Sequence, residues 1–398
     1  MQVDILDISL PFDYNTFVRT LSNEEKYRMH EKFRMVNEGK AMNARETVSK
    51  KPSTVEIEVG LAYEFLLSLI VFNEKKDYEY EMGSEWFETV RTKAGKDLLK
   101  TVRFFHSDCN HIWKHLLGIA YDSEPPKDVP ALLANLAAID PLELRLHTIG
   151  YYRRNFRRST PLDVILQAAE GDTEAQQQYI KTASREEGDW SNALRYIFSI
   201  NADKMKETLL FILQSWYERV FQYYEQQWLP ILERDAEAKR TMAATMPLER
   251  LIETATNGLL YEPEAGLRRV LLIPSLVERP WNELSEYQDI KIFCYPVADE
   301  SVAEDGHTPP IRLVRLYKAL ADERRLRILK LLMNRSYTLQ ELADEFGVAK
   351  TTMHHHLATL RTAGLVRAQA DGKFYNLRQD MLSEAAELLN SYLKGKAL

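Results

Sequence analysis

Cysteine, glycine and proline are all scarce in this chain of 398 residues, and it has no long hydrophobic run. Its two cysteines, Cys109 and Cys294, are too few for a disulfide framework or a zinc module with several cysteine ligands. Glycine and proline together make up about 8% of the chain, against roughly 12% in average proteins, which favours helices. The longest largely apolar stretch, Leu66–Phe72, is far shorter than the ~20 residues that cross a membrane.

The first ten residues carry two aspartates and no basic residue, unlike the positively charged start of a secretory signal. Together with the low cysteine content, this predicts a cytoplasmic protein without a membrane partner. The length suits two or three domains. A composition of 45% hydrophobic and 28% charged residues is ordinary for globular proteins.

The net charge of −7 is unevenly distributed along the chain. From Pro309 onward, 15 Lys and Arg face 9 Asp and Glu, so this end carries +6. The part before Pro309 has 37 basic and 50 acidic residues, which gives −13. Because Lys and Arg are needed only where a polyanion lies, a basic module joined to an acidic body indicates nucleic-acid binding at the C-terminal end.

The spacing of apolar residues in the acidic part predicts a mainly helical body. We expect one helix within Thr54–Glu74, a long helix over Asp203–Trp228 and a helix that starts at Pro230. Two apolar runs, Val270–Ile273 and Ile290–Tyr295, are expected to form a small pair of strands. The predicted organisation is an N-terminal arm at 1–50, a helical sensor-like or interaction domain at 51–298, an exposed polar linker at 299–309 and a DNA-binding and dimerisation domain at 310–398.

One segment of the body carries residue types that ligate metals. His111 and His115 are four residues apart and would share a helix face, and Asp108 or Cys109 could complete a transition-metal site. Ile112 stands where a zinc protease has its glutamate, so hydrolysis is not expected. We favour structural or surface histidines and predict no cofactor, while a metal-sensing site stays open as the alternative.

Two aromatic segments of the body leave their role open. Residues 151–158 interleave tyrosine and phenylalanine with four arginines and would suit a solvated helix face or an anionic effector. The aromatic residues between Phe211 and Trp228 fit a core, although a pocket for an apolar effector would contain the same residue types.

The C-terminal ninety residues predict a helix-turn-helix. Thr338 and Glu341 have the spacing of a capping box, which starts a short helix that must end at Gly347. The next helix is expected over Lys350–Ala363. Its apolar stripe of Met353, Leu357 and Leu360 would place Lys350, Thr351, His354 and His355 on the opposite, outer face, while His356 is expected to be a packed, hydrogen-bonded histidine.

A hairpin is expected to follow. Asp371-Gly372 separates two strand-like runs, and this dipeptide suits a tight turn because both residues tolerate positive φ. The hairpin would form the wing of a winged helix-turn-helix, and a final helix over Met381–Leu393 completes the module. The residues predicted to contact DNA are Lys350, Thr351, Thr352, His354, His355, Arg361, Arg367 and Lys373.

These segments resemble the ArsR-type winged helix-turn-helix regulators. The resemblance rests on Ala319–Leu329, Leu339–Gly347 and Thr352–Val366, and it covers about the last quarter of the chain. The helical body resembles a subset of the family that has a large N-terminal sensor-like region. The resemblance implies a homodimer that binds a palindromic operator, usually represses, and releases DNA when an inducer arrives.

The chain departs from this family at both familiar metal sites. No Cys-x-Cys pair occurs within Thr338–Leu342, and Asp380–Leu393 contains no histidine. A signal is therefore expected to enter through the body, through an unidentified small-molecule effector.

We therefore predict a transcriptional regulator, most simply a repressor, and not an enzyme. No Gly-rich phosphate loop, nucleophile elbow or clear acid–base pair occurs. Two alternatives remain: a catalytic or metal-binding body coupled to a winged helix, and a protein-interaction scaffold.

Overall fold

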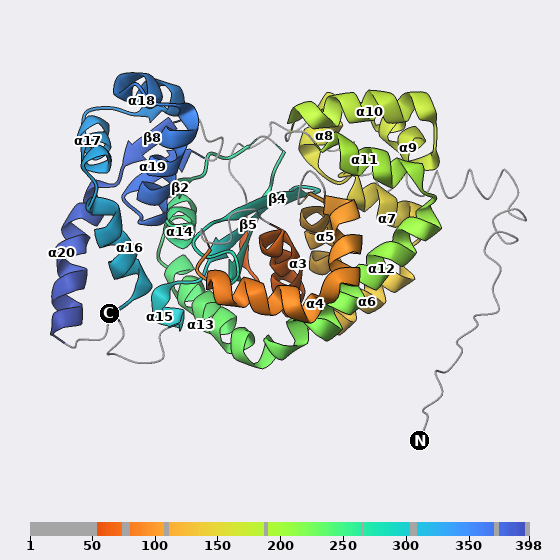
Figure 1. The fold of residues 1–398 in the computed structure, drawn as a ribbon, viewed down its shortest axis with the longest axis horizontal. Helices are drawn as coiled ribbons and strands as arrows, with labels where there is room; N and C mark the ends of the chain where they lie inside the picture. Colours follow the sequence, from red (N-terminus) through yellow and green to blue (C-terminus); the bar gives the residue numbers. More distant parts are fainter. Residues whose placement is uncertain are drawn as a thin grey trace, which may run out of the picture. The chain divides into compact units, whose positions relative to one another are not determined.

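The computed structural model describes residues 54–73, 80–106, 111–186, 190–264, 266–302, 309–369 and 374–394. The arm predicted at 1–50 lies outside these residues. Residues 51–398 form one compact unit. The described elements are mainly helices with a few short strands, as the composition and periodicity predicted (Figure 1).

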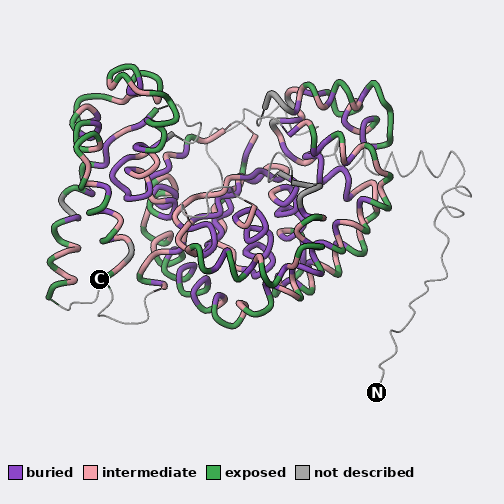
Figure 2. Tube along the Cα trace, in the orientation of Figure 1, coloured by how far each residue is buried: buried purple, intermediate pink, exposed green. Residues whose placement is uncertain are grey.

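The helices of the body enclose one large hydrophobic core. Its bulkiest fully buried side chains include Trp113, Trp190 and Trp216. Helix α3 is buried over almost its whole length, as Figure 2 shows. The helical elements are α3 (Leu61–Phe72), α4 (Gly83–His106), α5 (His111–Asp122), α6 (Val129–Ala138), α7 (Pro141–Thr148), α8 (Arg154–Ser159), α9 (Leu162–Glu170), α10 (Thr173–Glu186), α11 (Ser191–Ser199), α12 (Ala202–Arg219), η2 (Phe221–Tyr223), α13 (Glu225–Ala243) and α14 (Leu248–Ala255).

Three helices differ from the prediction. The long helix expected over Asp203–Trp228 is divided, because α12 ends at Arg219 and α13 begins at Glu225. Thr54–Ile57 is the strand β1 and not the start of α3, because three of its four residues are β-branched and Gly60 separates it from the helix. Pro230 lies inside α13 and does not start a helix. Burial of the neighbouring Ile231 and Leu232 offsets the backbone hydrogen bond that a proline removes.

A four-stranded sheet lies in the body, where the sequence predicted only a pair of strands. The order is β1-β3-β5-β4, with β4 antiparallel to β5 and the other pairs parallel. Leu271 and Ile273 of β3 belong to the large helical core, whereas Val270 and Leu272 pack with α14 in a second core. Burial on both faces explains the continuous apolar runs. The bounds are β1 (Thr54–Ile57), β3 (Arg269–Ser275), β4 (Glu283–Tyr287) and β5 (Ile290–Pro296).

The C-terminal elements have a separate hydrophobic core, built from Leu316, Ile328, Met353 and Leu357 among others. The wing strands β7 and β8 are antiparallel, and β6 pairs with β8. The elements are α16 (Ile311–Leu320), α17 (Glu323–Leu332), β6 (Tyr337–Thr338), α18 (Leu339–Phe346), α19 (Lys350–Thr362), β7 (Val366–Gln369), β8 (Phe374–Leu377) and α20 (Gln379–Leu393).

The first four residues of the segment that was expected to be an exposed polar linker are helical. Residues Asp299–Val302 form the short helix α15, and Ser301 is buried. Its Oγ donates a hydrogen bond of 3.0 Å to Oδ1 of Asp235 in α13. Buried polar partners on the body therefore fix residues 299–302, a tertiary effect that composition did not reveal.

Candidate nucleic-acid interface

Helices α18 and α19 form the predicted helix-turn-helix. The hydroxyl of Thr338 accepts from the backbone N–H of Glu341 at 3.2 Å, and the Glu341 carboxylate accepts from the Thr338 N–H at 2.7 Å. Gly347 ends α18 with φ of 61°, a left-handed conformation that costs glycine little. The capping box and this glycine set where α18 begins and ends, and thus how α19 leaves the turn.

Helix α19 presents a polar outer face. Met353, Leu357 and Leu360 are buried, as their spacing predicted. On the other side, five candidate DNA contacts are all exposed: Lys350, Thr351, Thr352, His354 and His355. The structure therefore brings these five side chains together on one accessible surface.

The first turn of α19 also differs from that of its neighbours. Asp322 caps α17 and Thr338 caps α18, but Ala349 at the start of α19 provides no side-chain cap. The first backbone N–H groups of a helix lack partners within it and attract anions. An uncapped helix start beside Lys350 is chemically suited to a phosphate group.

His356 lies on the inner side of α19 and is buried, as predicted. The predicted hydrogen bond is absent at its Nδ1, which has no partner among the described residues. This atom lies 4.0 Å from Oδ1 of Asp322, too far for a hydrogen bond. Burial lowers the pKa of His356, and the nearby Asp322 carboxylate opposes that shift only in part.

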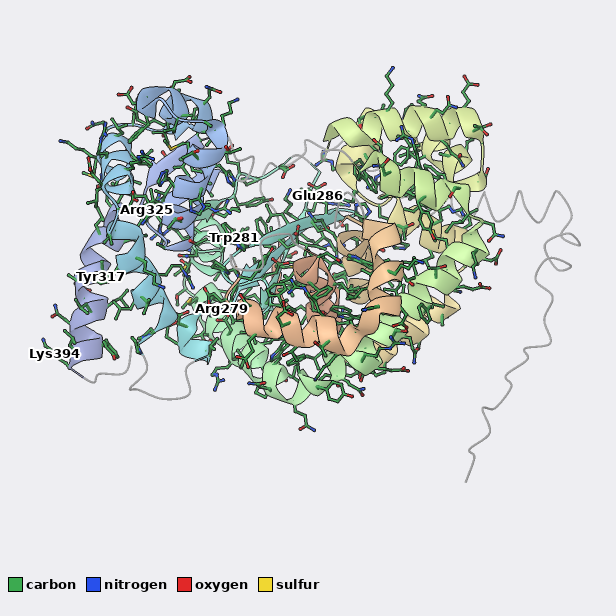
Figure 3. The ribbon with its side chains drawn as sticks, in the orientation of Figure 1. Arg279, Trp281, Glu286, Tyr317, Arg325 and Lys394 are labelled. Carbon is green, nitrogen blue, oxygen red and sulfur yellow. The ribbon has the colours of Figure 1, made fainter. Side chains whose placement is uncertain are left out.

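The other three candidate DNA contacts are placed differently. Arg361 lies over the ring of Trp281 in the body, at 5.3 Å from its centroid, and burial lowers its pKa. Figure 3 labels Trp281. The Nε of Arg367 lies 3.1 Å from Oε1 of Glu253 in α14. Lys373 and the turn at Asp371-Gly372 lie outside the described residues. Arg361 and Arg367 therefore contact the body and do not share the surface of the α19 group.

The body extends the sheet of the wing. The two-residue strand β2 (Leu259–Leu260) pairs in parallel with β7, aligning Leu259 with Ala368. The N–H of Ala368 donates to the carbonyl of Gly258 at 3.3 Å. The wing strand β7 is thus paired on both sides, with β8 and with a strand of the body.

Asn257 holds the C-terminal end of the recognition helix. Its Nδ2 donates to the carbonyl of Thr362 at 3.1 Å, and its Oδ1 accepts from Arg378 at 3.3 Å. A Cβ added at Gly364 would lie 2.7 Å from Oδ1 of Asn257, so only glycine allows this approach. Asn257 therefore couples the body to both α19 and the end of the wing.

A second group of contacts anchors α16. Arg315 donates to the same Thr362 carbonyl at 3.1 Å and forms an ion pair with Glu81 of the body. Glu81 also pairs with Arg279 at 2.8 Å, and Arg279 pairs with Asp299. These largely buried charges connect residues of the body directly to Arg315 of α16.

Of the four metal candidates, His115 is the one whose side chain the structure describes. His115 is buried, with its Nδ1 at 2.8 Å from the Thr148 carbonyl and its Nε2 at 3.2 Å from Arg153. Both ring nitrogens are thus used in the core. Asp108, Cys109 and the side chain of His111 lie outside what the structure describes, and no group of three ligating residues occurs in the described part of the chain.

The aromatic segments belong mainly to the core. Tyr151, Arg153 and Phe156 are buried, and burial lowers the pKa of Arg157, so these four side chains do not form a solvated face. Phe211 and Tyr223 are exposed, whereas Trp216, Phe221 and Trp228 are buried.

None of the helices that the structure describes is long and apolar enough to span a bilayer.

The sequence did not identify the residues of the body that contact the winged helix, namely Glu253, Asn257, Leu259 and Trp281. A two-residue strand and isolated polar side chains have no local pattern, so only the tertiary structure reveals them.

Comparisons with known proteins concern the C-terminal module. Residues 322–368 match the model of a family described as bacterial regulatory protein, arsR family. The chain is 37% identical over 81 residues to the transcriptional activator HlyU of Vibrio cholerae, which covers 20% of this chain and 75% of that protein. It is 31% identical over 83 residues to the transcriptional repressor SdpR of Bacillus subtilis, covering 20% of this chain and 92% of that protein.

A third relative is the probable mercury resistance operon repressor of Streptomyces lividans, 33% identical over 73 residues, covering 18% of this chain and 58% of that protein. No solved structure matches the chain. Because the matched segment spans most of HlyU and nearly all of SdpR, the chain belongs to the arsR family and is a DNA-binding transcriptional regulator.

Proposed function

We propose that the chain binds a palindromic operator as a homodimer, represses transcription in the cytoplasm, and is controlled through its body. Residues 310–398 act as the DNA-binding and dimerisation domain, and residues 51–298 act as the sensor-like domain. Control of DNA binding by the body is supported by one observation. The body contacts Arg361, Arg367 and the Thr362 carbonyl directly.

The exposed face of α19 would read the operator in the major groove. Lys350 at the first turn can bind a phosphate or a guanine, and the hydroxyls and imidazoles beside it can donate to or accept from base edges. The uncapped start of the helix favours a backbone phosphate near Lys350. These contacts fix both the position of the helix and the bases it reads.

The outer helices of the module would form the dimer interface. Val314 and Tyr317 on α16, with Leu382 and Leu393 on α20, are large apolar side chains exposed at the surface. The pairing α16·α20 brings the two helices side by side. A second copy that covers them would remove this apolar area from water, and two-fold symmetry matches a palindromic site.

Control would act by a shift between two arrangements of the chain, one with the winged helix docked on the body and one with it released. In the docked arrangement, Glu253 and Trp281 hold the two arginines, and β2 holds the wing. DNA binding by a dimer requires recognition helices about 34 to 36 Å apart. An effector that binds one arrangement better than the other changes the fraction of protein that meets this spacing.

Repression is the direction that we propose, with release of DNA in the docked arrangement. SdpR and the Streptomyces lividans relative are described as repressors, whereas HlyU is described as an activator. The docked arrangement engages two of the arginines predicted to contact DNA, which is consistent with an inducer-bound, low-affinity state.

The test is recovery of genomic fragments by the purified full chain, followed by affinity measurements on the enriched fragment at 50 and 200 mM salt. We expect enrichment of a palindromic site and a fall in affinity of more than about a hundredfold over this range. Absence of enrichment, or an affinity that does not depend on salt, would favour a protein-interaction scaffold.

A further inference from the structure

A polar pocket of about 540 Å³ opens where α14 of the body meets the wing. Its volume lies in the range of small-molecule sites, roughly 300 to 1,000 Å³. The described residues that line it include no carboxylate. The polar side chains that line it are Arg250, Arg335, Arg367, Ser336, Asn376 and Gln379, together with Asn334.

Three guanidinium groups reach this pocket from different elements. Arg250 comes from α14 of the body, Arg335 precedes β6, and Arg367 lies on the wing strand β7. Arg250 and Arg367 share one carboxylate, that of Glu253, at 2.8 and 3.1 Å. Arg335 pairs with Glu341 at 3.0 Å and lies over the Tyr337 ring.

The positive charge of the pocket exceeds the negative charge beside it. Arg250 pairs with Oε2 of Glu253 and Arg367 with Oε1, and Nε of Arg378 lies 3.9 Å from Oε1. Each guanidinium carries five N–H donors, so one carboxylate contact leaves donors of Arg250 and Arg335 available to a ligand. Both side chains are about half exposed, at 56% and 54%.

We propose that this pocket binds a small organic polyanion, with phosphate or carboxylate groups, as the effector of the protein. Guanidinium groups bind both kinds of anion through paired N–H donors. The hydroxyl of Ser336 donates to Oδ1 of Asn376, and Nδ2 of Asn376 supplies a neutral donor for the rest of the ligand. The effect on DNA that follows rests on the function proposed above.

The bound anion bridges the body and the winged helix. It joins Arg250 on one side to Arg335 and Arg367 on the other, so it stabilises the docked arrangement. Arg367 is then held away from DNA by Glu253 and by the ligand together. An anion in this pocket therefore raises thermal stability and lowers operator affinity at the same time.

The first experiment measures the melting temperature of the full chain with citrate or pyrophosphate at 10 mM, in magnesium-free buffer, with chloride holding the ionic strength constant. We expect a rise of about 3 °C with at least one of these anions. The rise is expected to be lost in Arg250→Gln and in Arg335→Gln. If only one anion acts, its chemistry identifies the phosphate or the carboxylate source.

Arg91→Gln is the matched control, because the side chain of Arg91 is 40% exposed and pairs with Glu88 three residues away, as Arg250 pairs with Glu253. This variant is expected to keep the full rise. No rise with either anion in the wild type, or an equal rise in Arg250→Gln, would overturn the proposal. This measurement needs no DNA, so it tests anion binding by the pocket even if the chain proves to bind no operator.

The second experiment measures operator affinity with and without the active anion. We expect the anion to weaken wild-type binding about fivefold, and to leave the affinity of Arg250→Gln at that variant's own anion-free value. An anion effect on Arg250→Gln as large as the effect on the wild type would overturn the proposal.

Discussion

Oε1 of Glu253 in the body lies 3.1 Å from Nε of Arg367 in the wing. The side chain of Glu253 is only 5% exposed, and that of Arg367 is 26% exposed, so the pair is partly shielded from salt. A charge that an operator phosphate would attract is thus engaged by an acidic group of the same chain. This contact links the acidic body to the basic module at one defined position.

Glu253→Gln is expected to strengthen operator binding by about fivefold, because Arg367 becomes available to a phosphate. Fluorescence anisotropy with a labelled operator measures the change. Glu237→Gln is the control for loss of a carboxylate, since Glu237 also pairs with an arginine three residues away, Arg240 of the same helix α13. Unchanged or weaker binding by Glu253→Gln would show that this contact does not restrain the wing.

Leu382→Glu is expected to convert the dimer to a monomer, because it places a charge in the apolar surface of α16 and α20. Leu382 is 38% exposed, so the substitution leaves the core of the module intact. Sedimentation velocity measures the mass. Leu162→Glu is the control, with a leucine that is 40% exposed on α9 of the body, and it should remain a dimer. A dimeric Leu382→Glu protein would contradict the assigned interface.

Glu64→Gln is expected to change how stability depends on pH. Glu64 is fully buried on α3, and burial raises its pKa to about 7 even though the N–H groups of Leu276 and Val277 donate to its Oε1. A carboxyl with a raised pKa stabilises the fold below its unfolded pKa, and that stability is lost as the pH rises through about 7.

Denaturant unfolding at pH 5 and pH 7.5 tests this. Relative to Glu64→Gln, the free energy of unfolding of the wild type should fall by about 2 to 3 kcal/mol between these values. The glutamine keeps the acceptor for both N–H groups and cannot ionise. Parallel pH profiles for the two proteins would show that Glu64 does not titrate in this range.

The helix-turn-helix was predictable because its determinants are local. The Thr338–Glu341 capping box, the left-handed Gly347 and the Met353, Leu357 and Leu360 stripe each lie within one helix or its end. Such short-range signals fix the start, end and buried face of a helix with little help from distant residues.

The contacts of the long arginine side chains were less predictable. Arg361 and Arg367 were expected to contact DNA from their positions on α19 and β7, but Trp281 and Glu253 lie against them. Those partners are about 80 and 114 residues away in sequence, and no local periodicity encodes such pairs.

The strands of the body show a related limit. Ile57 and Leu61 are four residues apart, which fits a helix, yet Thr54–Ile57 pairs with β3. The pairing partner at Arg269–Leu272 decides the outcome, since a short β-branched segment takes its conformation from the strand beside it. The same holds for Leu259–Leu260, which forms a strand only against the wing.

Operator binding by the double variant Lys350→Ala with His354→Ala tests the central claim most directly, with Lys330→Ala on α17 as the control for loss of an exposed lysine. We predict that the double variant stays folded by circular dichroism and binds the operator about fiftyfold more weakly, while Lys330→Ala binds as the wild type does. Binding by the double variant within about twofold of the wild type would contradict the assignment of the exposed α19 face as the DNA-reading surface.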